Sequence, residues 1–185
     1  MFKPLEKLIP KSSLNVLMKD ADLAAIGGSS SVRSGSDRKD SLLIDQLVGL
    51  LGNYTGALWR DGDGRAYKEM RHFQNRFPNI GDGGFDLPRC KIDFKASMMR
   101  YSQDPSKYRL AVRPRERHPG WVYVLILVEE FSLQEFDGLS ALKTYLVGWV
   151  HDDDLPEHPE LTGPFSGAFT VKATDLIPVI PLNYC

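Results

Sequence analysis

The segment that decides the fold is GGFDLPRCKIDFKAS, residues 83–97, where an apolar strand pattern also carries acids and bases. Alternate residues of an extended strand share one face of a sheet. Within residues 91–98, one face would carry Lys91, Asp93, Lys95 and Ser97, and the other Ile92, Phe94, Ala96 and Met98. The apolar face can therefore pack on a helix, while the polar face presents a carboxylate and an ammonium group roughly 7 Å apart.

A second acid, Asp86, lies seven positions before Asp93, and the turn residues Pro88 and Arg89 lie between them. A hairpin that bends at this turn would bring the two carboxylates together. Two neighbouring carboxylates repel each other unless a cation or a proton intervenes, so the pair predicts either a hard-cation site or a raised pKa. Carboxylate oxygens favour Mg²⁺ or Mn²⁺ over zinc. A solvated strand face with ordinary charges is the alternative, and the pattern leaves both open.

The elements around this segment predict an α/β fold with a mixed β-sheet flanked by helices. A helix is expected at residues 38–51, where leucines recur at helical spacing and Gly52-Asn53 would end it. A short amphipathic helix is expected within residues 13–26, and residues 53–82 contain mainly turn signals. The other expected elements are a short strand near 84–87, strands at 91–101, 108–114, 121–131 and 143–150, a short helix within 132–144, and a last strand within 165–180.

Residues 38–185 are expected to form a single domain, long enough to bury a sizeable core. Residues 1–37 are expected to be an N-terminal extension that ends in a Gly/Ser-rich linker, GGSSSVRSGSD. No apolar run approaches the ~20 residues of a membrane-spanning helix, so no membrane partner is expected. Because the first residues lack the apolar core of a signal peptide, we expect a cytoplasmic (intracellular) protein. The only cysteines, Cys90 and Cys185, have no ligand spacing, so neither a disulfide framework nor a zinc site is expected.

Charge is unevenly distributed along the chain, although the net charge is only −1. Residues 60–117 contain 14 Lys and Arg against 8 Asp and Glu, whereas residues 129–160 contain 9 acids and one lysine. The basic half includes the Asp86 to Lys95 segment. This asymmetry favours a polyanion-binding face, although long cationic side chains that merely coat one surface would give the same count.

The spacing D-x₆-D-x-K formed by Asp86, Asp93 and Lys95 resembles the PD-(D/E)xK motif of the restriction-endonuclease-like nuclease superfamily. By position, Asp86 matches the first acid of the motif, Asp93 the second acid and Lys95 the lysine. Phe85 stands where the motif has proline, and the second acid is Asp rather than the commoner Glu. The superfamily core runs helix, three strands, helix, strand, and the elements expected in residues 38–150 follow a similar order. The resemblance therefore implies a restriction-endonuclease-like core.

The resemblance also implies a Mg²⁺-dependent (or Mn²⁺-dependent) endonuclease that hydrolyses phosphodiester bonds of DNA, or of RNA, by metal-activated water. Asp86 and Asp93 would hold the metal, and Lys95 would orient the water or stabilise the transition state. Asp45 on the expected first helix and Asp82, four residues before Asp86, are candidate accessory acids. A double-strand cut needs two active sites, so a homodimer is expected.

Basic residues downstream of the motif are candidates for contacts to nucleic acid, because the arginine guanidinium can pair with two phosphate oxygens at once. These candidates are Arg100, Arg109, Arg113, Arg115 and Arg117. The sequence contains no helix-turn-helix or zinc-finger pattern that would predict base readout.

Two rival hypotheses remain open at the level of sequence. The first is a non-catalytic nucleic-acid-binding or assembly protein on a nuclease-like α/β scaffold, in which Asp93 and Lys95 are only an ion pair on a sheet face. The second is an interaction module unrelated to nucleic acid, which would leave the basic half unexplained. The nuclease hypothesis requires the carboxylates of Asp86 and Asp93 to lie within about 5 Å of each other, close enough to share a cation bound at ~2.1 Å.

Overall fold

The computed structural model describes residues 2–27, 38–76, 86 and 90–179. Short 3₁₀ turns connect several of its elements, among them η4 (Pro114–Glu116). In chain order the helices and strands are β1 (Leu5–Pro10), α1 (Lys11–Gly27), α2 (Arg38–Asp61), α3 (Arg65–Arg76), β2 (Ile92–Met98), β3 (Arg109–Val112), β4 (Val122–Val128), α4 (Leu133–Phe136), β5 (Ala141–His151) and β6 (Phe169–Lys172). The expected α/β class is confirmed.

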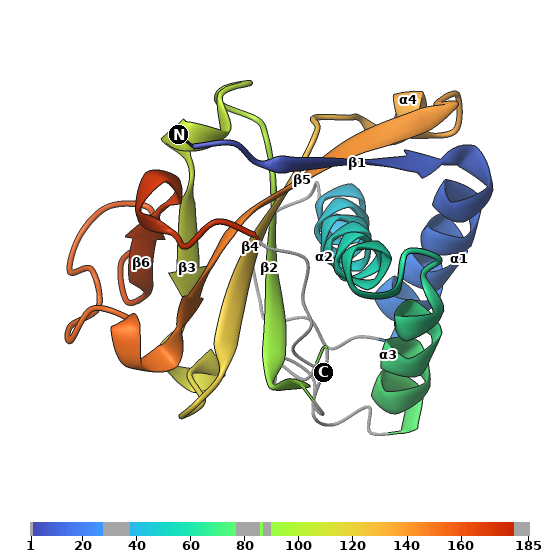
Figure 1. Cartoon of the computed structure of the whole chain (residues 1–185). Helices are drawn as coiled ribbons and strands as arrows, with labels where there is room; N and C mark the ends of the chain where they lie inside the picture. Colours follow the sequence, from blue (N-terminus) through green and yellow to red (C-terminus); the bar gives the residue numbers. More distant parts are fainter. Residues whose placement is uncertain (1, 28–37, 77–85, 87–89, 180–185) are drawn as a thin grey trace.

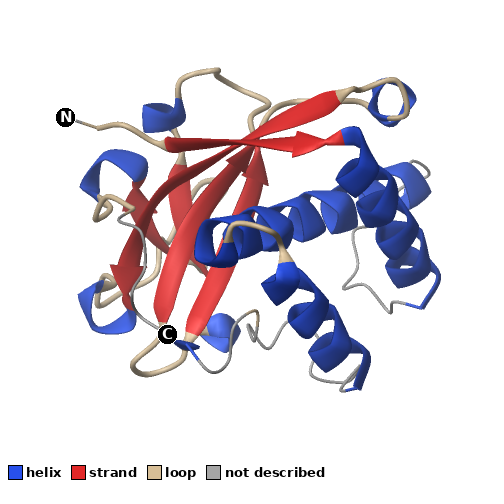
Figure 2. Ribbon diagram, turned by 45° about the vertical axis from the view of Figure 1, so that its right-hand side comes forward, coloured by secondary structure: helices blue, strands red, loops and turns tan. Residues whose placement is uncertain are grey.

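The described strands form two sheets. A four-stranded mixed sheet has the order β1-β5-β4-β2, in which β2 and β4 are parallel and the other neighbours are antiparallel. β3 and β6 form a separate antiparallel pair. The helices α1, α2 and α3 lie on one side of the four-stranded sheet and the β3–β6 pair on the other (Figures 1 and 2). The molecule therefore has three layers, with one hydrophobic core on each side of the sheet.

The N-terminal segment belongs to these layers, although the sequence suggests an extension. β1 pairs with β5, so it forms one edge of the four-stranded sheet. Ile9 on β1 and Leu14 and Leu17 on α1 are fully buried in the core on the helical side. From α2 onward the described order is helix, helix, three strands, helix, strand, so α3 is an addition to the expected order, and the middle strand β3 pairs with β6 outside the main sheet.

The alternation expected along β2 is confirmed by its packing. Phe94 and Ala96 face α2, where they lie against Gly56 and Gly52. The intervening residues therefore project to the opposite side of the sheet, because alternate strand residues point to opposite faces. The neighbouring strand β4 is apolar on both faces, and its residues 123–128 are all buried. One face of β2 thus packs in the core beneath the helices, and the other face carries the polar side chains.

Helix α2 extends ten residues beyond the expected end at residue 51, reaching Asp61. Gly52, expected to end the helix, serves close packing instead. A Cβ atom at Gly52 would lie 2.5 Å from the Cβ of Ala96 on β2, so only glycine allows α2 and β2 to approach this closely. The helix ends where Gly62 adopts a positive φ of 77°, a conformation that glycine accepts readily.

Substitution of Gly52 by alanine is expected to destabilise the protein by about 2 kcal/mol or more, because the new methyl group would overlap Ala96 in a packed core. Gly49→Ala on the same helix is the matched control, since a Cβ there meets no atom within 4 Å. We expect that control to stabilise the protein by about 0.5–1 kcal/mol through helix propensity. Urea denaturation monitored by circular dichroism measures both, and equal effects of the two variants would contradict the packing argument.

Helix α3 occupies a region where the sequence suggests turns. The DGDG turn is present at residues 61–64, and the Asp61 carboxylate caps the next helix by accepting hydrogen bonds from the backbone N–H groups of Gly64 and Ala66. Beyond this turn, Tyr67 and Met70 bury one face of α3 against the helical core. Charged residues lie between these apolar positions, so the helical hydrophobic pattern is too short to recognise in the sequence.

Several expectations concern residues that lie outside the described part of the chain or next to it. The Gly/Ser-rich stretch 28–37 lies outside the described residues, as does the strand expected near 84–87 apart from Asp86. Cys90 is disulfide-bonded, although no disulfide framework was expected, and the other cysteine, Cys185, lies outside the described residues. None of the described helices is long and apolar enough to cross a membrane.

Candidate active site

Strand β2 carries Asp93 and Lys95 on the sheet face opposite α2. The Lys95 Nζ atom lies 2.8 Å from Asp93 Oδ2, and the Asp93 side chain is only 3% exposed. In the parallel ladder Asp93 lies opposite Tyr123 of β4, whose side chain belongs to the core on the β3–β6 side. The alternation of β2 therefore places a nearly buried ion pair between the four-stranded sheet and the β3–β6 layer.

Asp86 lies beside the same strand. It is buried, and its Oδ2 atom accepts a hydrogen bond of 2.9 Å from the backbone N–H of Phe94. The carboxyl groups of Asp86 and Asp93 are close enough to share a hydrogen bond when one of them is protonated. The structure thus brings together Asp86, Asp93 and Lys95, the three residues that the D-x₆-D-x-K spacing singles out. Their catalytic role remains a prediction.

Burial dominates the electrostatics of this cluster. It raises the pKa of Asp86 to about 8, and the neighbouring charge of Asp93 acts in the same direction. Burial also raises the pKa of Asp93, although the Lys95 ammonium opposes that shift. For Lys95, burial favours the neutral form, but the charges of Asp93 and Glu116 outweigh it and raise its pKa. Near neutral pH the two aspartates therefore hold a proton that a cation can replace.

A third acid, Glu116, joins the cluster and was not predicted from the sequence. It ends the turn η4, and its Oε2 atom accepts a hydrogen bond of 2.8 Å from Lys95 Nζ. The Lys95 ammonium consequently lies between Asp93 and Glu116, at 2.8 Å from an oxygen of each. Glu116 has no strand pattern around it, so only a hydrophilic turn is visible in the sequence.

One buried oxygen of the cluster lacks a hydrogen-bond donor. Asp93 Oδ2 is inaccessible to water, and although the Lys95 ammonium is near, no described group donates a hydrogen bond to it with suitable geometry. Groups of three or more metal-ligating side chains are absent among the residues that the structure describes. A pair of carboxylates nevertheless suits Mg²⁺, which is commonly held by one or two carboxylates and by substrate phosphates and waters. The residues present fit such an ion.

The two candidate accessory acids lie elsewhere. Asp45 is exposed on α2, the helix that covers the opposite face of the sheet from Asp93 and Lys95. Asp82 lies outside the described residues. Of the candidate acids, only Asp86 and Asp93 are seen together in the described part of the chain.

The five candidate arginines occupy different environments. Arg109 forms an ion pair with Glu160 at 2.8 Å, and Arg117 pairs with the buried Asp152 at 3.1 Å. Arg100 is exposed and follows the far end of β2.

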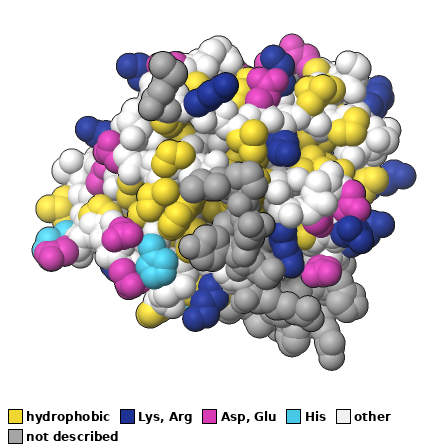
Figure 3. Space-filling view, viewed as in Figure 1, with side chains coloured by type: hydrophobic (Ala, Val, Ile, Leu, Met, Phe, Trp, Pro, Cys, Tyr) yellow, Lys and Arg dark blue, Asp and Glu magenta, His cyan; other side chains and the backbone are white. Residues whose placement is uncertain are grey.

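Arg113 and Arg115, by contrast, are exposed on or beside η4, the turn that supplies Glu116 to the cluster. The structure thus places these two arginines next to the cluster, and their contact with nucleic acid remains a prediction. Elsewhere, on the face seen in Figure 3, basic side chains are interspersed with acids, so the described part of that face shows no single basic patch.

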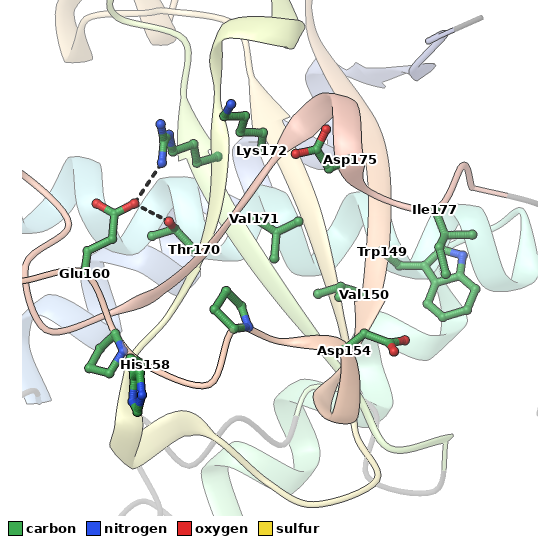
Figure 4. Close-up of a pocket in the computed structure, with 13 residues that line it drawn as sticks. Trp149, Val150, Asp154, His158, Glu160, Thr170, Val171, Lys172, Asp175 and Ile177 are labelled. Atoms are coloured by element: carbon green, nitrogen blue, oxygen red, sulfur yellow. Dashed lines mark hydrogen bonds and ion pairs between the residues drawn. The ribbon is translucent and has the colours of Figure 1, made fainter.

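A separate hollow with a volume of about 790 Å³ is lined by residues of β3, β5 and β6 and of the segment between β5 and β6 (Figure 4). Its wall includes Arg109, Glu160, Thr170 and Lys172. Glu160 accepts hydrogen bonds from both Arg109 and Thr170, so these groups satisfy one another. The hollow does not include Asp86, Asp93 or Lys95, and the buried acids beside β2 remain the stronger candidate for chemistry.

Comparison with protein-family models, with curated proteins and with solved structures finds no match to this chain. The candidate site therefore depends on its geometry alone.

Proposed function

We propose that this protein is a Mg²⁺- or Mn²⁺-dependent nuclease with a restriction-endonuclease-like core, and that it hydrolyses phosphodiester bonds of DNA. The observation that carries the proposal is the pair of buried aspartates, Asp86 and Asp93, beside a lysine ammonium on the same face of β2. Burying two acids together is costly, because each carboxylate loses its hydration and repels the other. A site that uses them to hold a cation accounts for that cost.

Asp86, Asp93 and Lys95 each have a role in the proposed reaction. Asp86 and Asp93 would hold the ion through carboxylate oxygens, and the N–H of Phe94 fixes the orientation of Asp86. Bound there, the ion would lower the pKa of a water molecule and neutralise charge that develops on the phosphate. The Lys95 ammonium lies 2.8 Å from Asp93, and it would orient the attacking water or pair with the negatively charged phosphate oxygens.

A cleavage assay tests the proposal. The purified protein is incubated with duplex and single-stranded DNA and RNA, each in Mg²⁺, Mn²⁺ or EDTA. We expect cleavage that requires the divalent ion, and comparison of the substrates identifies the polymer that is cut. Salt-sensitive binding without cleavage under any of these conditions would instead establish the non-catalytic binding protein. Light scattering of the protein with and without a DNA duplex tests the homodimer that a double-strand cut requires.

Arg113→Ala is expected to weaken DNA binding several-fold and to reduce the salt dependence of binding by about one counterion, as loss of one phosphate contact would do. Arg109→Ala is the matched control, because that guanidinium is paired with Glu160 beside the separate hollow. We expect Arg109→Ala to leave affinity and salt dependence unchanged. Fluorescence anisotropy with a labelled duplex in Ca²⁺, at about 50–200 mM salt, measures both. Equal losses in the two variants would contradict the assignment of the substrate contact to η4.

A further inference from the structure

Glu116 is held in place by more than its ion pair with Lys95. Its carboxylate also accepts a hydrogen bond from the backbone N–H of Arg113 at 3.4 Å, which closes the η4 turn. The side chain is only 14% exposed. A carboxylate this well shielded, with one oxygen shared between the turn and an ammonium group, has little freedom to move.

The backbone of residues 116–118 is held by the side chain of Tyr123, which lies on β4 opposite Asp93. The Tyr123 hydroxyl donates a hydrogen bond to the Glu116 carbonyl at 3.1 Å and accepts one from the His118 N–H at 2.7 Å. Between these residues, Arg117 binds the buried Asp152 through both its Nε and Nη2 atoms. The backbone at Glu116 and His118 is therefore held by Tyr123 of β4, and the Arg117 side chain is held by Asp152, the residue that follows β5.

We infer that Glu116 is a positioning residue of the proposed active site, which fixes the place of the Lys95 ammonium beside Asp93 by pairing with it as a second carboxylate. A lysine side chain has four flexible methylene groups, so one carboxylate alone does not fix the position of its nitrogen. Two carboxylate oxygens, each 2.8 Å from Nζ, do fix it. This inference rests on the proposed nuclease function and adds a residue to it.

Loss of Glu116 is expected to affect the chemical step rather than substrate binding. Without the second carboxylate, the ammonium would be held by Asp93 alone, and its position relative to the proposed reaction centre would no longer be fixed. Because a displacement of about 1 Å can cost 10²-fold in rate, we expect Glu116→Ala to lower kcat by about 10²-fold. The value of KM should change less than about twofold, because the Glu116 carboxylate is engaged by Lys95 and the Arg113 N–H and would make no attractive contact with a phosphate. Glu116→Gln keeps an oxygen acceptor for Lys95, so we expect it to retain about a tenth of the wild-type kcat.

Tyr123→Phe tests the same positioning without altering any charge in the cluster. It removes the hydroxyl that clamps residues 116–118 while preserving the volume of a fully buried side chain. We expect kcat to fall in the same direction as in Glu116→Gln, with KM unchanged. Because Tyr123→Phe and Glu116→Gln preserve most of the packing, these two variants carry the test if Glu116→Ala fails to fold.

A matched control is available in the chain. Glu135 caps helix α4 much as Glu116 caps η4, accepting a hydrogen bond of 3.0 Å from the Ser132 N–H, but it is exposed and lies outside the cluster. Glu135→Ala should leave kcat and KM at their wild-type values. If Glu116 were merely a cap, the two alanine variants would behave alike.

The experiment measures kcat and KM for Mg²⁺-dependent cleavage by the wild-type protein, Asp93→Ala, the two Glu116 variants, Tyr123→Phe and Glu135→Ala. A fall in kcat for both Glu116 variants and Tyr123→Phe, with KM and Glu135→Ala unchanged, would support the inference. Wild-type kcat in Glu116→Ala, or a change confined to KM, would overturn the inference about Glu116. In that case, loss of cleavage in Asp93→Ala would still support the nuclease proposal. Absence of cleavage by the wild-type protein would overturn both.

Discussion

Asp93→Asn is expected to reduce divalent-ion-dependent cleavage by at least about 10³-fold, which corresponds to the loss of about 4 kcal/mol of transition-state stabilisation. Asparagine preserves the volume and one oxygen of the aspartate but removes its negative charge. The cation would then have only Asp86, while the Lys95 ammonium would lose one of its two carboxylate partners. Single-turnover kinetics with a labelled duplex measure the rate without interference from product release.

Asp104→Asn is the control for this substitution. Asp104 lies in the same basic half of the chain and also accepts a backbone hydrogen bond, from Ser106, but it is exposed. We expect its cleavage rate to match that of the wild-type protein. Full activity of Asp93→Asn would remove the basis of the nuclease proposal, because no charge at Asp93 would then be needed for the reaction.

The second large effect concerns stability and pH in the absence of divalent ions. The pKa of Asp86 is about 8 in the folded protein and lies near 4 in an unfolded chain. Between these values the folded state retains a proton that the unfolded state has released. The free energy of unfolding should therefore fall as pH rises from about 4 to 8, by up to about 1.4 kcal/mol per pH unit. The raised pKa of Asp93 acts in the same direction.

Asp86→Asn should flatten this pH dependence, so that in EDTA the variant is more stable than the wild-type protein at pH 8. Mg²⁺ should stabilise the wild-type protein more at pH 8 than at pH 5, because the ion takes the place of the shared proton. Urea denaturation at a series of pH values, in EDTA and in Mg²⁺, measures both effects. Asp137→Asn, which alters an exposed acid, should keep the wild-type slope. A wild-type slope in Asp86→Asn would contradict the raised pKa.

The parts of the fold that the sequence predicted are those with a strong local pattern. The strict alternation around Phe94 and the uninterrupted apolar run of β4 depend on burial of one or both strand faces, which local sequence records directly. The juxtaposition of Asp93 and Lys95 follows from the same alternation. Their proximity to Asp86 was expected from the turn residues Pro88 and Arg89, which lie outside the described residues.

The remaining features depend on contacts between distant segments. Gly52 suggests a helix end in isolation, and only its contact with Ala96 explains why α2 continues. β1 is a short strand that follows Pro4 and ends at Pro10, and its partner β5 lies far along the chain. Glu116 is one acid in a polar turn, and its position beside Lys95 is created by the clamp that Tyr123 and Asp152 provide. No local pattern encodes these relationships.

The pairing of β1 with β5 also determines when the four-stranded sheet can be completed during translation. Leu5 lies opposite Leu146, so the first described strand to leave the ribosome waits longest for its partner. At about 5–20 residues per second, the nascent chain carries this strand unpaired for on the order of ten seconds. The segments around Asp93 and Glu116 emerge during that interval. Synthesis of β5 thus sets the moment at which the sheet that supports them acquires its final edge.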